Sequence, residues 1–74
     1  MHDLVTIDPE TLGGTPVFKG TRVPVESLFD HLSLGISLET FLDDFPSVTR
    51  EQALRVIEAA GHQFMQQLEH ETVG

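Results

Sequence analysis

The stretch Gly13–Val25, which reads GGTPVFKGTRVPV, decides how this chain begins to fold. Two short β-prone runs, residues 16–18 and 21–23, flank the pair Lys19-Gly20, and this pattern predicts a β-hairpin. A proline bounds the hairpin on either side, because proline donates no hydrogen bond to a strand ladder. Upstream, residues 4–7 have the composition of a further strand.

Part of the same stretch resembles a nucleotide-binding loop. Residues 14–21 nearly match the Walker A pattern G-x-x-x-x-G-K-[ST], but Lys and Gly are exchanged. That loop works because its last residues open a helix whose amides face the phosphates. Here Thr21 is followed by Arg22-Val23-Pro24, and a residue that precedes proline is pushed towards extended conformations. The stretch therefore favours a hairpin over a phosphate site.

From Val25 onward the apolar period changes from two to about 3.6, which predicts helices. A first helix carries its apolar stripe on Val25, Leu28, Phe29 and Leu32, and Gly35 follows as a left-handed C-terminal cap. The period thus places a helix directly after the hairpin.

A second and a third helix follow. Ser37 is placed to cap the second helix, which Pro46 ends. Thr49 and Gln52 match a capping box for the third, in which each side chain bonds the other residue's backbone amide. The apolar stripe of the third helix comprises Leu54, Ile57, Gly61, Phe64, Met65 and Leu68. The predicted fold class is mainly α: a short N-terminal β-hairpin region, residues 1–24, followed by a three-helix bundle with a helix-turn-helix, residues 25–74.

Length and composition restrict the class of protein. Seventy-four residues with 39% hydrophobic side chains indicate one small globular domain that is marginally stable alone. Since the chain has no cysteine, oligomerisation or a partner is the expected support. The start of the chain lacks a signal peptide and no apolar run is long enough for a membrane span, so we expect a cytoplasmic protein.

The charge pattern bears on nucleic acid binding. On a helix-turn-helix interpretation, Arg50, Gln52 and Arg55 of the third helix face DNA, and Lys19 and Arg22 add phosphate contacts from the hairpin. The four cations among them are all the Lys and Arg residues of the chain, against twelve acidic residues and a net charge of −8. Such a balance opposes non-specific binding to DNA.

A plainer interpretation of the third helix also fits. Glu51 and Arg55 lie at i, i+4 and pair on a solvated face, while Gln52 already serves the capping box. Asp43 and Asp44, just before the turn, repel phosphate. The sequence leaves these two interpretations open.

The titratable residues give no pattern typical of an enzyme. Glu58 and His62 share a helical face with His70 two turns on, but no third metal ligand is convincingly placed. Asp43-Asp44 is typical of a solvated helix end rather than of an acid/base pair. We therefore expect no catalysis, no metal and no cofactor.

Dimerisation is expected on two surfaces. A hairpin this short is marginal unless its edges pair or pack elsewhere, which suggests an interface at Val17 and Phe18. Phe64, Met65 and Leu68 extend beyond what two short helices cover. A homodimer through one or both surfaces is the prediction.

A series of motifs in fixed order resembles the small bacterial and archaeal family known as domain of unknown function 433. The motifs lie between Leu4 and Ala60 and are Ile7-Asp8-Pro9, Gly13-Gly14-Thr15-Pro16-Val17, Gly20-Thr21-Arg22-Val23-Pro24-Val25, Gly35-Ile36-Ser37-Leu38-Glu39 and Asp44-Phe45-Pro46-Ser47-Val48-Thr49. The resemblance implies a homeodomain-like three-helix fold and a VapB-type antitoxin, which binds a PIN-like ribonuclease toxin and represses its own operon by binding operator DNA.

Two other classes of function remain as alternatives. In the first alternative the chain is a stand-alone DNA-binding regulator. In the second it is an interaction module that binds no nucleic acid. In many antitoxins a segment beyond the DNA-binding part contacts the toxin, and here only Gly61–Gly74, which is predicted to be helical, follows the motifs.

Overall fold

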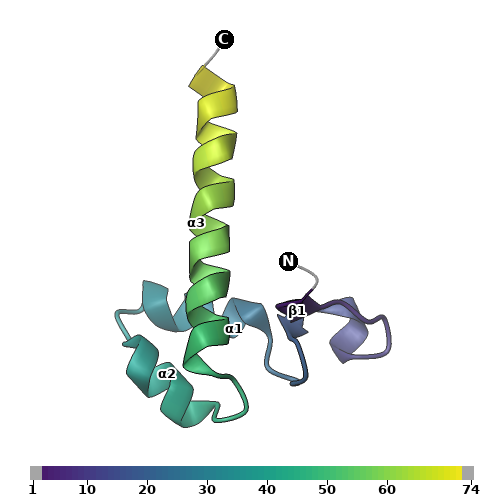
Figure 1. Ribbon diagram of the computed structural model, residues 1–74. Coiled ribbons are helices and arrows are strands. Elements are labelled where there is room, and N and C mark those ends of the chain that lie inside the picture. Colours follow the sequence, from purple (N-terminus) through teal and green to yellow (C-terminus); the bar gives the residue numbers. More distant parts are fainter. Residues whose placement is uncertain (1–2, 73–74) are drawn as a thin grey trace.

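The computed structural model describes residues 3–72 and shows a small β region followed by three helices (Figure 1). This confirms the predicted fold class. The elements in chain order are strand β1 (Val5–Thr6), the 3₁₀ turn η1 (Leu12–Gly14), strand β2 (Val17–Phe18), and helices α1 (Val25–Ser33), α2 (Leu38–Asp44) and α3 (Arg50–Thr72).

The two strands form an antiparallel pair in which Val5 lies opposite Phe18 and Thr6 opposite Val17. The hairpin partner therefore differs from the sequence prediction, because β2 pairs with the upstream strand and residues 21–23 form no strand. The Thr21 hydroxyl accounts for the difference. It donates to the Phe18 carbonyl at 2.8 Å and accepts from the Val23 amide at 3.0 Å, which holds these residues in a tight turn.

The chain still runs back beside β2 after this turn. The Phe18 amide donates to the Val23 carbonyl at 3.0 Å, and Val17 forms an isolated bridge with Pro24. The Val25 amide donates to the Pro16 carbonyl at 3.0 Å, so this pairing continues up to the first residue of α1.

The helix ends follow the predicted capping. α1 ends in a Schellman motif, with Gly35 at φ 79° and the Ile36 amide bonded to the His31 carbonyl at 2.9 Å. Ser37 caps α2 by accepting from the Thr40 amide at 3.1 Å. Local hydrogen bonds to free backbone groups therefore set the end of α1 and the start of α2.

One hydrophobic core joins the β region to the helices. Phe18, Leu28 and Phe41 are fully buried at its centre, and the Phe18 and Phe41 ring centroids lie 6.1 Å apart. The remaining buried members are Leu4, Val23, Val48, Ala53 and Val56. None of them lies beyond Val56, so the core covers only the first two turns of α3.

The rest of α3 stands clear of the body of the protein (Figure 1). Ile57, Ala59 and Ala60 are half-buried, and every described side chain from residue 61 to residue 71 is exposed. The helix is 23 residues long, and at about 1.5 Å per residue its last turns project well past the core.

Candidate functional site

The α2–turn–α3 unit is the first candidate, because it was predicted to present α3 to DNA. Phe45 ends α2, and a turn closed by a 3.0 Å hydrogen bond from the Val48 amide to the Phe45 carbonyl leads to α3. Val48 is buried and anchors this turn in the core. The unit thus holds the start of α3, with Arg50 and Glu51, at the surface.

Arg50 is bound to a neighbouring helix. One of its guanidinium nitrogens contacts the carboxylate of Glu39 in α2, and both side chains remain more than half exposed. An exposed pair of this kind is weak and exchanges readily with solvent. To contact a phosphate or a base, Arg50 would first have to leave Glu39.

Gln52 has a role that the sequence did not suggest. Its backbone amide donates to the Thr49 hydroxyl at 3.1 Å, as the capping pattern predicted, but its side chain does not complete the capping box. Instead, Nε2 donates to the carbonyls of Lys19, at 3.1 Å, and Leu4, at 3.3 Å. No local sequence pattern predicts these contacts, since the partners lie 33 and 48 residues away in the chain.

Arg55 reaches towards the β region. Its guanidinium lies 3.9 Å from the carboxylate of Asp3. A backbone hydrogen bond lowers the pKa of the Asp3 carboxyl, and the positive charge of Arg55 acts in the same direction. Arg55 also lines an open pocket of about 380 Å³ together with Leu4, Glu58, Ala59 and His62. Arg55 is the single Lys or Arg among these lining residues.

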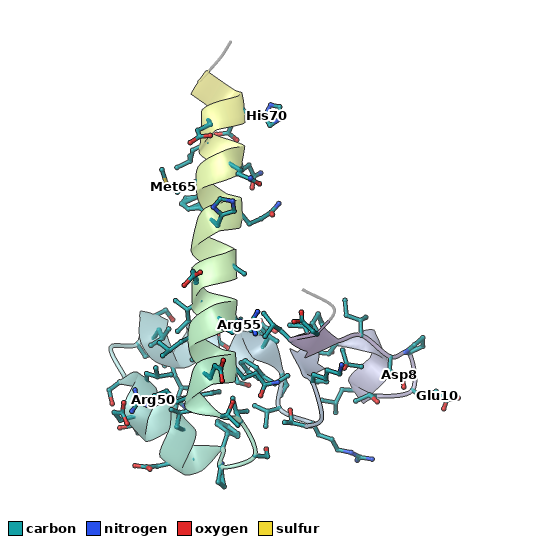
Figure 2. All side chains as sticks on the ribbon, in the orientation of Figure 1. Asp8, Glu10, Arg50, Arg55, Met65 and His70 are labelled. Atoms are coloured by element: carbon teal, nitrogen blue, oxygen red, sulfur yellow. The ribbon has the colours of Figure 1, made fainter. Side chains whose placement is uncertain are left out.

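Lys19 and Arg22 are exposed at the turn after β2. Within residues 3–72, neither side chain takes part in an ion pair. The two arginines of α3 are held by different neighbours, α2 and the chain before β1, and Figure 2 shows Arg50 beside α2 and Arg55 higher on α3. The basic side chains therefore do not gather into a single patch.

The acidic side chains, by contrast, dominate the surface. All twelve Asp and Glu residues lie in the described part of the chain, and all are exposed. Residues 25–44, which form α1 and α2, contain five of them and no Lys or Arg. We call these five the α1–α2 acidic surface: Glu26, Asp30, Glu39, Asp43 and Asp44.

The predicted dimer contacts divide into two groups. Val17 and Phe18 are 2% and 0% exposed inside the core, so the prediction that they lie at an interface is wrong for this fold. They are buried because the chain covers both sides of β2 itself, with β1 and with the segment up to Pro24. Phe64, Met65 and Leu68 are 59%, 54% and 37% exposed, and they are available to a second molecule.

The histidines form no metal centre in the described residues. Between residues 3 and 72 no three His, Asp or Glu side chains come together in a way that would hold a metal ion. His62 is instead 3.2 Å from the amide nitrogen of Gln66 on the same helix, and His31 lies edge-on to Phe41 with ring centroids 5.3 Å apart.

The helices also bear on membrane insertion. In the part of the chain that the structure describes, none combines the length and the apolar character that crossing a membrane requires.

Comparison with known proteins identifies relatives of the compact part. Residues 5–59 match the family described as "Protein of unknown function (DUF433)". The uncharacterized protein y4eO of Sinorhizobium fredii is 44% identical over 51 residues, which is 69% of this chain and 23% of that protein. The chain thus spans less than a quarter of the length of that relative.

A solved structure is also similar. The crystal structure of a DUF433 member from Anabaena variabilis matches with a TM-score of 0.66 and 27% identity, over 97% of this chain and 70% of that one. The family match ends at residue 59, close to the point where α3 leaves the core.

Proposed function

The chain belongs to the DUF433 family, and from this membership and the charge of its surface we propose that it is a non-catalytic, antitoxin-like protein that binds a basic partner protein. The family assignment confirms the resemblance read from the sequence motifs. The partner chemistry is the proposal: a nuclease whose RNA-binding surface is positively charged, as the PIN-like toxins implied by the resemblance are.

One observation carries this proposal: every acidic side chain is exposed, and very few cations offset them. The charged groups of α1 and α2 are all acidic, apart from a histidine. On each helix two of the acids lie four residues apart, Glu26 with Asp30 and Glu39 with Asp43, and so share a face. A surface of one sign attracts a partner of the opposite sign and speeds their association.

The same charge suits inhibition of a nuclease. A ribonuclease must attract RNA phosphates with Lys and Arg, and a protein of net charge −8 competes with RNA for that surface. The charge of this protein therefore supports binding to such a partner.

The test pairs this protein with the product of the neighbouring gene. We expect a stable complex on co-expression, inhibition of RNA cleavage by the partner, and affinity that falls as salt rises. Asp43→Lys should weaken the complex at least tenfold. The matched control Glu10→Lys, an equal charge change on the far side of the β region, should leave affinity within about twofold. A neighbour that is no nuclease, or equal losses in both variants, would refute the proposal.

Operator binding is a second candidate, supported by the α2–turn–α3 unit and by the two unpaired cations at the β2 turn. Binding through α3 requires Arg50 to exchange Glu39 for a phosphate or base. A gel shift with DNA from the chain's own promoter tests this, with and without the partner protein. Arg50→Ala and Lys19→Ala should each reduce the shift and its salt dependence. A shift that both variants leave unchanged would argue against this surface.

A further inference from the structure

The projecting half of α3 carries an apolar face that nothing in the described chain covers. We define this distal face as Gly61, Phe64, Met65 and Leu68, which recur at spacings of three and four residues and lie on one side of the helix. The three side chains are exposed in the monomer, and Figure 2 shows Met65 projecting from the helix above the body of the protein.

An uncovered helix of this length is poorly supported in water. The described side chains from residue 61 to residue 71 are all exposed, and a helix without tertiary packing is only marginally stable in water even in a favourable sequence. Gly61 weakens it further, since glycine is among the poorest helix formers. The apolar face therefore needs a cover for the helix to persist.

The charge distribution indicates which molecule covers it. Residues 59–68 contain no Asp, Glu, Lys or Arg, and these ten residues are the longest uncharged run of the chain. A basic partner would find no acidic side chain to pair with on this segment. A second copy, which also carries a charge of −8, would meet the least repulsion here.

Gly61 also favours a second copy as the molecule that covers the distal face. Apart from its chain neighbours and the backbone of its own helix, no atom lies within 4 Å of the position that a Cβ would take. No packing among the described residues therefore requires a glycine here. On an otherwise bulky face it leaves a hollow of the kind that admits a large side chain from a facing helix.

We propose that two copies pair through the distal faces of α3 in antiparallel orientation. Phe64 of one copy then packs against Met65 of the second copy, and Leu68 fills the hollow at Gly61 of the second copy. In a parallel pair Gly61 would face Gly61 and leave a void. An antiparallel pair also keeps the two acidic bodies at opposite ends of the helix pair, where they repel one another least.

This surface is separate from the α1–α2 acidic surface, and its tests use the protein alone, so it stands or falls independently of the proposed function. Sedimentation equilibrium should give a dimer at tens of micromolar. Gly61→Leu should weaken the dimer at least tenfold while raising the helix content of the monomer, because leucine favours helix but fills the hollow. Gln63→Leu, which adds the same side chain on the opposite side of α3, should leave the dimer within about twofold.

A monomer at several hundred micromolar would overturn the pairing, as would a Gly61→Leu variant that dimerises as well as the wild type. Because the chain contains no cysteine, a single introduced one can carry a spin label at a chosen position, which gives the orientation. Antiparallel pairing places labels at Gln67→Cys, on the flank of the distal face, within about 8 Å of each other along the helix pair, and separates labels at Glu58→Cys by about 20 Å. Close approach at both positions would show a parallel pair and refute the proposed register.

Discussion

The side-chain amide of Gln52 lies 3.1 Å from the backbone carbonyl of Lys19 and joins α3 to the turn after β2. The same nitrogen reaches the Leu4 carbonyl at 3.3 Å, so a single side chain bonds both halves of the β region. This contact fixes how the long helix sits on the strands.

We expect Gln52→Ala to destabilise the protein by about 1–3 kcal/mol, since two hydrogen bonds are lost at roughly 0.5–1.5 kcal/mol each. Urea unfolding followed by circular dichroism measures the change. Gln63→Ala removes the same group from the exposed part of α3 and should alter stability by less than about 0.5 kcal/mol. Equal effects in the two variants would mean that Gln52 does not hold the β region.

Two glycines should respond to alanine in opposite directions. Gly35 adopts φ 79° at the end of α1, and an L residue is strained there, so Gly35→Ala should lower stability by about 1–2 kcal/mol. Gly61 lies in regular helix with open space around it, so Gly61→Ala should raise the helical signal at 222 nm at low protein concentration. A loss of helical signal in Gly61→Ala would show that the fold of the monomer itself requires a glycine at this position.

Substitution of two phenylalanines, one buried and one exposed, should distinguish the hydrophobic core from the proposed dimer interface. Phe18 is fully buried, and Phe18→Ala should cost about 3–5 kcal/mol, enough to unfold much of so small a protein. Phe64 is 59% exposed, so Phe64→Ala should leave the unfolding of the monomer nearly unchanged and reduce dimerisation. Unfolding curves and sedimentation of both variants make the comparison. A folded Phe18→Ala variant that fails only to dimerise would restore β2 as an interface.

The Arg50–Glu39 pair should contribute little to stability. Both side chains are more than half exposed, so a double-mutant cycle of Arg50→Ala and Glu39→Ala should give a coupling energy of about 1 kcal/mol or less. The coupling should shrink further as salt rises. A coupling above about 2 kcal/mol would mean that the pair is a fixed structural link and that Arg50 is not available to other ligands.

Helix boundaries and the general fold could be predicted from sequence because local chemistry sets them. The Gly35 cap, the Ser37 cap and the Thr49 cap each involve residues within five positions of one another, so their signals lie in short windows of the sequence. The apolar stripes likewise predicted correctly that Leu28 and Phe41 face a core. The family assignment followed from motifs of the same local kind.

The candidate site depended on contacts that no window contains. Only the tertiary structure decided that β2 pairs with Val5–Thr6, which buries Val17 and Phe18, and that Gln52 bonds carbonyls 33 and 48 residues away. It also decided that the core ends near Val56 and leaves the distal face of α3 open. Periodicity reveals which side of a helix is apolar, but how far that side is covered depends on where the other elements pack against it.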